Sequence, residues 1–288
     1  MSFPDILTAD ARAIEARLVN ALATRADEPV IHAMRYAVAG GKRLRGFLVL
    51  ESARLHGVGD RALSAAVAIE ALHAYSLIHD DLPCMDDDDL RRGQPTVHRK
   101  WDEATAVLAG DALQTLAFEL LCDPLLGSAE VRMALVLGLA KASGAEGMVL
   151  GQALDMAAEV ATAPLTLDQI THLQAGKTGA LIRFAAQAGA IIAGADPRPL
   201  DAYAQALGLA FQIADDILDV KGDPEKAGKR LGKDAEAGKA TFVSLLGLEG
   251  AEARAKALIA EAEAHLSPYG DKAATLIAAA RFVISRDS

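Results

Sequence analysis

The sequence has few aromatic residues and few cysteines. Phe, Trp and Tyr together make up 4% of its 288 residues, and the cysteines are Cys84 and Cys122. Two cysteines supply neither a disulfide framework nor a Cys-rich zinc site, and they are typical of a protein from a reducing compartment. The 24 glycines and 10 prolines are close to average usage, which excludes collagen-like and low-complexity chains.

Positive charge is also in short supply. Lys and Arg number 29 against 39 Asp and Glu, which gives a net charge of -10 and an isoelectric point near 5.2. This charge has the wrong sign for a protein whose main role is to neutralise nucleic-acid phosphates. We therefore expect no nucleic-acid partner.

The sequence lacks the marks of export and of membrane insertion. The first residues, MSFPDILTADARAIEARL, carry acids and a helical period instead of a basic segment followed by an apolar run. The most apolar stretches, near residues 104–121 and 178–195, are interrupted by charged residues, so we interpret them as buried helices. We expect a cytoplasmic protein without stable membrane insertion.

Helix-forming apolar residues are abundant. Apolar residues make up 52% of the chain and recur at spacings of three and four. This pattern, without a run of strict alternation, predicts an all-α fold of roughly ten to twelve helices. Thr166 and Gln169 have the spacing of a capping box, and Asp60 is the expected N-cap of a helix over residues 61–79. Since repeats and long linkers are lacking, residues 1–288 are expected to form a single domain.

A strongly acidic segment, DDLPCMDDDD, follows the predicted helix 61–79 and covers residues 80–89. Pro83 cannot continue the helix, so Asp80 and Asp81 fall in its last turn, where the helix dipole makes carboxylates unfavourable. A solvated acidic loop is the simplest alternative for such a run.

A second acidic cluster favours metal binding over that alternative. The segment FQIADDILD, residues 211–219, lies in a predominantly apolar helix, and Asp215 and Asp219 share one face about 5.4 Å apart. Like charges at that spacing destabilise a helix unless a cation neutralises them. Carboxylates without Cys or clustered His suit Mg²⁺ or Mn²⁺, which complete their coordination with water and substrate phosphates. The two clusters predict divalent metal between the protein and a phosphorylated substrate.

Four segments place cations beside glycines. They are GGKRLR at 40–45, RRG at 91–93, KTG at 177–179 and GKRLGKD at 228–234. In such segments, backbone and side-chain donors can both approach an anion. Singly each has a structural explanation, because a Gly-Lys pair is common and Arg-Arg can pair with nearby acids. Together they indicate a site for two polyanions, one diphosphate bound through metal and one bound directly by Arg and Lys.

In their order along the chain, these motifs resemble those of the trans-isoprenyl diphosphate synthases, or polyprenyl synthetases, and most of all the bacterial farnesyl diphosphate synthases. The resemblance includes the four residues between Asp81 and Asp86, which are typical of the bacterial form. The matching segments are 40–45, 80–93, 151–155, 177–179, 211–219 and 228–239. One departure is Gly46, which replaces the Pro common after the first basic motif, and another is Phe242-Val243 in place of Tyr-Pro.

The resemblance implies an all-α isoprenoid synthase fold in which the two Asp-rich helices face a central cavity. It also implies a homodimer. It implies condensation of isopentenyl diphosphate with dimethylallyl and geranyl diphosphate, 1′-4 and head-to-tail, to give (E,E)-farnesyl diphosphate. The allylic diphosphate would ionise with the help of three Mg²⁺ ions, with Mn²⁺ as a substitute. The implied metal ligands are Asp80, Asp86, Asp215 and Asp219.

The same resemblance assigns the other site residues. Catalysis would depend on the acids of both clusters and one lysine, namely Asp80, Asp81, Asp86, Asp215, Asp216, Asp219 and Lys177. The allylic diphosphate would be surrounded by Arg91, Lys177, Thr178, Gln212, Lys229 and Lys239. Isopentenyl diphosphate would be bound by Lys42, Arg45, His73 and Arg92. Tyr75 and Ser76, one turn before Asp80, would form a floor that stops growth at fifteen carbons.

Several alternatives stay open at the level of sequence. The same reaction with geranyl or geranylgeranyl diphosphate as product differs only in the floor, and Tyr75 could be core packing with its hydroxyl satisfied nearby. His73 could be a structural histidine. A terpene cyclase would not need the cations of a second diphosphate site. A non-catalytic synthase subunit would be expected to lack acids in one of the two clusters.

Overall fold

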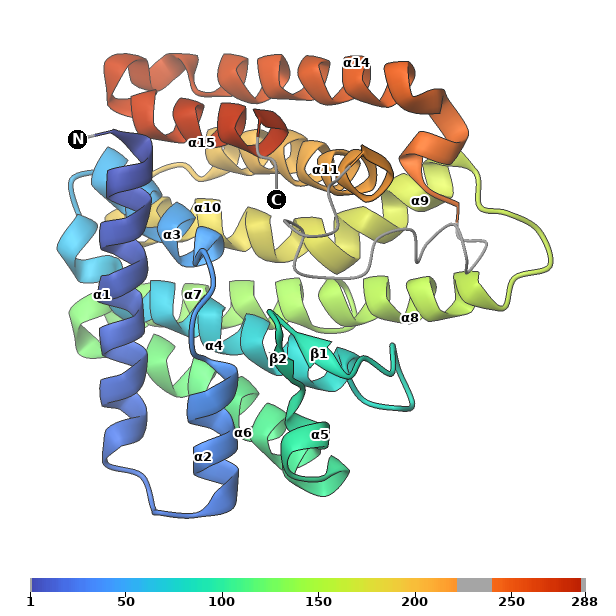
Figure 1. The fold of residues 1–288 in the computed structure, drawn as a ribbon. Helices are drawn as coiled ribbons and strands as arrows, with labels where there is room; N and C mark the ends of the chain where they lie inside the picture. Colours follow the sequence, from blue (N-terminus) through green and yellow to red (C-terminus); the bar gives the residue numbers. More distant parts are fainter. Residues whose placement is uncertain (1, 222–239, 286–288) are drawn as a thin grey trace. The chain divides into compact units, whose positions relative to one another are not determined.

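The protein is almost entirely helical in the computed structural model, which describes residues 2–221 and 240–285 (Figure 1). Helices make up 79% of the structure, and the described residues contain thirteen α-helices, or twelve when α9 and α10 are counted as one. The helices are α1 (Phe3–Ala23), α2 (Pro29–Ala37), α3 (Leu44–Leu55), α4 (Leu63–Asp80), α5 (Val97–Lys100), α6 (Glu103–Leu121), α7 (Ala129–Ser143), α8 (Met148–Glu159), α9 (Leu167–Gln174), α10 (Ala180–Ala193), α11 (Arg198–Lys221), α14 (Phe242–His265) and α15 (Ala274–Ser285). The all-α prediction is confirmed.

Contacts divide the chain into two compact units. Unit 1 is Met1–Leu137 with Ala188–Ala195, and unit 2 is Gly138–Gln187 with Asp196–Ser288. The boundaries fall inside α7 and α10, so neither unit is a continuous segment. The single domain expected from the sequence stays a prediction.

In unit 1, α4 is the central helix. It is apolar around nearly its whole circumference, as expected for a helix that neighbours cover on several sides, and it packs against α1, α3 and α6. One contact with α6 is very close, because a Cβ atom on Gly110 would lie 2.1 Å from Nε2 of His79. Glycine at position 110 therefore leaves space for the side chain of His79, near the end of α4.

The start of α4 differs from the sequence prediction. The helix begins at Leu63 with Ala62 at the N-cap, so the assignment of Asp60 as N-cap is wrong. The chain enters α4 from a 3₁₀ turn, Gly59–Ala62, in which the amide of Arg61 donates to the carbonyl of Val58. The turn supplies a backbone acceptor where a side-chain cap was expected.

A two-stranded hairpin follows the acidic loop. Strand β1 (Leu90–Arg91) pairs antiparallel with β2 (Gln94–Pro95) through the two-residue turn Arg92-Gly93. Both turn residues have positive φ, 54° and 75°, as a type I′ turn requires. The all-α pattern did not predict this hairpin, because two-residue strands are too short to show alternation.

Unit 2 contains α11 with α14 and α15 packed against it (Figure 1). The capping box predicted at Thr166 and Gln169 is present at the start of α9. The helix then continues into α10 through the π-helical turn Ala175–Gly179. Such turns inside α-helices are frequent at functional sites.

Two described segments are long and apolar enough to cross a membrane, judged by length and composition alone. They are α6 and the run Ala129–Glu159, and 44% and 28% of their apolar windows are buried. The core helix of a soluble protein passes the same test. The expectation of no stable membrane insertion therefore stays a prediction.

Candidate active site

The first basic motif forms the loop between α2 and α3. Gly40 and Gly41 have positive φ, 69° and 95°, and Arg43, the N-cap of α3, is also left-handed at 54°. This backbone leaves Lys42 exposed and buries Arg43, whose exposed fraction is 5%. Arg43 donates a hydrogen bond to the carbonyl of Val38, which closes the loop across its base.

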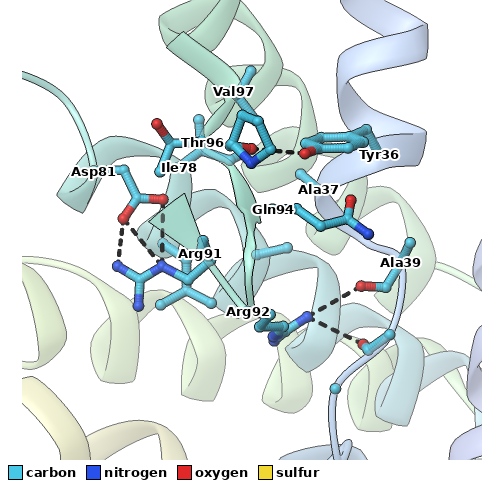
Figure 2. A pocket seen from close by; sticks show the side chains of 15 residues that line it. Tyr36, Ala37, Ala39, Ile78, Asp81, Arg91, Arg92, Gln94, Thr96 and Val97 are labelled. Carbon is cyan, nitrogen blue, oxygen red and sulfur yellow. Dashed lines mark hydrogen bonds and ion pairs between the residues drawn. The ribbon is translucent and has the colours of Figure 1, made fainter. Parts of the chain in front are cut away.

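Arg92 lies against the same loop. Its Nη1 atom donates to the carbonyl oxygens of Ala39 and Gly40, at 3.2 and 3.1 Å (Figure 2). A Cβ atom on Gly41 would lie 2.8 Å from the Arg92 guanidinium, so this close approach requires glycine. Around the contact is a cavity of about 280 Å³, lined by the end of α2, by α4 and by the hairpin.

Arg91 points to a different partner. Its Nε atom donates to Oδ1 of Asp81 at 3.0 Å, and Nη2 makes a second bond to the same carboxylate (Figure 2). Asp81 is 3% exposed, and burial raises its pKa while Arg91 lowers it. Burial lowers the pKa of Arg91, but the hydrogen bond to Asp81 and the negative charge of Asp81 have the larger effect, so the pKa of Arg91 is raised. Asp81, predicted among the catalytic acids, is thus bound to the fold through Arg91.

Asp80 and Asp86 come together at the end of α4. Asp80 is the last residue of the helix and Asp81 its C-cap, as the sequence predicted. The amide of Asp86 donates to the carbonyl of Asp80 at 2.8 Å, so the intervening loop folds back on itself. The main chain therefore sets the two predicted metal ligands of the first cluster next to each other.

His73 lies two turns before Asp80 on α4 and is partly buried. Burial lowers its pKa well below the usual value, and nearby arginines, Arg45 first, lower it further. The imidazole is neutral at pH 7 and can donate one N–H to an anion. His73, Arg45 and Arg92 are thus within electrostatic reach of one another, as a shared ligand would require.

Tyr75 is buried against α6. Burial raises the pKa of its hydroxyl and Gln114 lowers it, and its ring meets that of His79 edge-on at 5.5 Å. His79 is itself held by a contact of 3.0 Å between Nε2 and the carbonyl oxygen of Val107. Ser76 donates to the carbonyl of His73 at 2.9 Å. The structure thus shows Tyr75 as a buried side chain packed against His79, and its role as a floor stays a prediction.

In unit 2, the π-helical turn carries Lys177 and Thr178. Nζ of Lys177 donates to Oδ2 of Asp155 at 2.6 Å, and Thr178 donates to Oε1 of Gln212 at 3.1 Å. A Cβ atom on Gly151 of α8 would lie 2.0 Å from the amide nitrogen of Lys177. The turn is therefore seated directly on α8, with its two functional side chains tied to α8 and α11.

The second acidic cluster lies on α11, as predicted. Asp216 is buried, accepts a hydrogen bond from the amide of Phe242 at 2.7 Å and contacts Gln212 Nε2 at 3.5 Å. Asp215 and Asp219 are more exposed than Asp216. Asp216, predicted as catalytic, anchors the start of α14 to α11.

The donor set fits Mg²⁺ but does not form a complete cage. Among the described residues, no group of three His, Cys, Asp or Glu side chains is arranged to hold a metal. Asp80 with Asp86, and Asp215 with Asp219, each offer carboxylate oxygens from one short segment. Mg²⁺ usually takes one or two carboxylates and fills its shell with water and phosphate oxygens, which matches this arrangement. The predicted residues Lys229 and Lys239 lie outside the described ranges.

Sequence reasoning gave no role to three side chains that lie beside residues of the predicted motifs or site. They are Glu70 beside Arg43, Gln114 beside Tyr75 and Asp155 beside Lys177. Glu70 had a signal in the sequence, because it is a lone acid in the apolar run AAVAIEALHAY. Gln114 had no such signal, since Tyr75 is distant from it in the sequence.

Glycine-flanked cations and two carboxylate clusters on a helical scaffold are the features expected of a protein that binds phosphorylated ligands with metal. Residues 27–275 match the family model described as Polyprenyl synthetase, and the chain belongs to this family. The family predicted from the motifs is confirmed, as is the isoprenoid synthase fold.

Known relatives agree over nearly the whole chain. The chain is 50% identical over 270 residues to the farnesyl diphosphate synthase of Escherichia coli (strain K12), covering 90% of both. It is 47% identical over 262 residues to the farnesyl diphosphate synthase of Geobacillus stearothermophilus, covering 88% of both. Among solved structures, an FPP/GFPP synthase from Zymomonas mobilis has a TM-score of 0.90 and 47% identity, covering 98% of both chains.

Proposed function

We propose that this protein is a metal-dependent prenyltransferase that makes (E,E)-farnesyl diphosphate from isopentenyl diphosphate with dimethylallyl and geranyl diphosphate. The observation that carries the proposal is the close similarity, along 90% of the chain, to proteins named farnesyl diphosphate synthase. Both acidic clusters and three of the four basic segments lie in the described residues, in the order expected. A terpene cyclase or a non-catalytic subunit would not require this complete set.

The allylic diphosphate would be held through metal by the acidic clusters. Asp80, Asp86, Asp215 and Asp219 would hold Mg²⁺, and Lys177 would contact the diphosphate directly. Bound Mg²⁺ supplies positive charge that stabilises the departing diphosphate. The C1–O bond breaks, the diphosphate leaves with the electron pair, and an allylic cation remains on C1.

Isopentenyl diphosphate would be held without metal by Lys42, Arg45, His73 and Arg92. Its double bond attacks the allylic cation, so that a bond forms between C4 of isopentenyl diphosphate and C1 of the allylic group. Loss of a proton from C2, which we assign to the released diphosphate as base, restores the double bond. The protein's part is to position the substrates, bind the charges and exclude water, and no covalent intermediate with the enzyme is needed.

A longer product is the second candidate. The similar protein from Zymomonas mobilis is described as an FPP/GFPP synthase, so one relative with this fold is not limited to farnesyl diphosphate. We favour fifteen carbons because relatives that are 50% and 47% identical to this chain are named for that product. Geranyl and geranylgeranyl diphosphate are the remaining alternatives.

We also propose a cytoplasmic homodimer with Mg²⁺, three ions when substrate is bound, and no nucleic-acid partner. The family and the acidic charge support these points. A homodimer would sediment at twice the 30.0 kDa chain mass.

The test of the reaction is incubation of purified protein with isopentenyl diphosphate and dimethylallyl, geranyl or farnesyl diphosphate in Mg²⁺, with products resolved by chain length. We expect the fifteen-carbon diphosphate to accumulate from the first two starters. Twenty or more carbons would keep the reaction and overturn the product. Folded protein that condenses no starter would contradict the proposal.

A further inference from the structure

Glu70 is a buried acid in the middle of α4. Its exposed fraction is 4%, and its neighbours along the helix from Ala65 to Ala74 include no other acid. A buried carboxylate without partners is unstable, so the fold must offset its charge. Both of its oxygens are engaged at the start of α3, where the basic loop ends.

One oxygen caps α3 and the other faces Arg43. The amide of Gly46 donates to Oε1 of Glu70 at 2.8 Å, and Nη1 of Arg43 lies 3.6 Å from Oε2. Gly46 occupies the third position of α3, where an amide has no acceptor within the helix. The N-cap residue Arg43 makes no side-chain cap. An N-cap side chain ordinarily accepts a hydrogen bond from an amide in the first turn of its helix. For α3, Glu70 of α4 accepts this bond instead.

This bond depends on the residue at position 46. Proline, common at this point in the family that the sequence resembles, has no N–H to donate. A Cβ atom on Gly46 would lie 2.6 Å from Cδ1 of Ile14 and 3.1 Å from Cγ of Glu70. Glycine thus allows α3 to approach both α1 and Glu70 closely enough for the hydrogen bond.

Glu70 also acts on the cations around the basic loop. Burial and the charge of Arg43 lower the pKa of Arg92, while Glu70 raises it. Arg43 is 5% exposed, so it needs a counter-charge inside the protein. With Glu70 in place, Arg43 stays inside and bonds to Val38, which fixes the loop that carries Lys42.

We propose that Glu70 is a positioning residue for the diphosphate bound directly by Lys42, Arg45 and Arg92. It holds the start of α3, which carries Arg45, and the Arg43 side chain, and so fixes the loop that carries Lys42 and that Arg92 contacts through the carbonyls of Ala39 and Gly40. The inference rests on the proposed function for the identity of the diphosphate, which is that of isopentenyl diphosphate.

Glu70→Gln separates positioning from simple electrostatics. The amide can still accept from Gly46 but leaves Arg43 without a counter-charge. Removing a negative charge near an anion site would by itself strengthen anion binding. Loss of positioning weakens it, so the two explanations predict opposite signs.

The experiment measures the Kd of isopentenyl diphosphate by calorimetry in EDTA, its KM in Mg²⁺, and the KM for geranyl diphosphate. For Glu70→Gln we expect Kd and KM for isopentenyl diphosphate to rise about tenfold, with KM for geranyl diphosphate within about twofold. The matched control is Glu51→Gln, which alters another buried acid paired with an arginine, Arg54. Arg54 keeps Asp10, and we expect the control to bind isopentenyl diphosphate as the wild type does.

Unchanged or tighter binding by folded Glu70→Gln would overturn the inference. If that variant does not fold, the double variant Arg43→Met with Glu70→Gln removes both charges and keeps the test open. It should fold and bind isopentenyl diphosphate at least about tenfold more weakly, and wild-type affinity would overturn the inference. Wild-type protein that binds no isopentenyl diphosphate and forms no product would instead refute the proposed function.

Discussion

Adjacent residues in the site motifs have different environments. In each of three pairs, one side chain is buried and bonded within the fold, while its neighbour is more exposed. The pairs are Lys42 with Arg43, Asp81 with Asp80, and Asp216 with Asp215. On a helix, successive side chains point about 100° apart, so two neighbours rarely share a ligand. The buried members position the site, and the exposed members are those we expect to meet substrate.

Asp80→Asn and Asp81→Asn should therefore fail in different ways. Asp80→Asn removes a predicted metal ligand, so kcat should fall about 10²-fold or more, with a higher Mg²⁺ requirement. Asp81→Asn removes the nearest of the acidic partners of Arg91 and leaves Asp88 at 3.9 Å, so the free energy of unfolding should fall with a smaller effect on the Mg²⁺ requirement. Activity titrated against Mg²⁺, alongside urea unfolding, measures both. Equal shifts of the Mg²⁺ requirement in the two variants would contradict this division.

Tyr75 allows a test of product length. Tyr75→Ala removes the ring, and products should shift beyond fifteen carbons. Tyr75→Phe keeps the ring and loses only the hydroxyl, so it should still stop at fifteen. Chain-length analysis of the products distinguishes them, and an unchanged spectrum in Tyr75→Ala would remove Tyr75 from this role.

His73 gives the fold a dependence on acid. Its pKa is lower in the folded chain than the usual value near 6.5, so below that pH the unfolded chain takes up the proton first. Stability should fall as pH decreases through about 6.5, by up to about 1.4 kcal/mol per pH unit from this group.

His73→Gln should consequently lose less stability than the wild type between about pH 6.5 and 5.5. Burial also lowers the pKa of His56, so some acid sensitivity should remain. Urea unfolding at several pH values measures the slope, with the exposed His172→Gln as control. A slope unchanged by His73→Gln would show that the histidine titrates normally in the folded state.

The roles of single residues could be predicted only in part. Spacing and charge placed Asp80 at the end of a helix and Asp215 within one, and both positions are confirmed. The same reasoning could not tell Asp216 from Asp215. What separates them is the amide of Phe242, a partner 26 positions away, and sequence spacing carries no information about such contacts.

At the scale of elements, long periodic helices followed from the sequence and short irregular ones did not. The helix that contains Asp215 and the capping box at Thr166 were both expected and are present. The hairpin 90–95 and the π-helical turn 175–179 were not expected, although both carry predicted site residues. The hairpin depends on the positive φ of Gly93, and the π-helical turn on its close approach to Gly151. Neither requirement shows as a periodic pattern in the sequence.

Gly151→Ala tests the close packing of the π-helical turn against α8. The added methyl would lie 2.0 Å from the amide nitrogen of Lys177, so α8 and the turn must separate. We expect a loss of about 1–3 kcal/mol in the free energy of unfolding, together with a raised KM for the allylic substrate. Gly250→Ala in α14 is the control, because its nearest neighbour would be 3.3 Å away and alanine favours helix. Equal stability of the two variants would refute the close approach.

At the scale of the whole molecule, each of the two compact units holds one half of the expected chemistry. Unit 1 contains the basic loop, the hairpin and the first acidic cluster. Unit 2 contains the π-helical turn and the second acidic cluster. The family predicted from the order of these motifs is confirmed along residues 27–275. The order of the motifs along the chain was enough to predict the family, because this order does not depend on how side chains pack.

In the mechanism that we propose, one diphosphate is bound through metal and the other directly by arginine and lysine. The most direct test is calorimetry of the wild type with geranyl diphosphate and with isopentenyl diphosphate, each in Mg²⁺ and in EDTA. We predict that geranyl diphosphate binds only in Mg²⁺, whereas isopentenyl diphosphate binds with similar affinity in both. Isopentenyl diphosphate that requires Mg²⁺, or geranyl diphosphate that binds equally well in EDTA, would contradict the account.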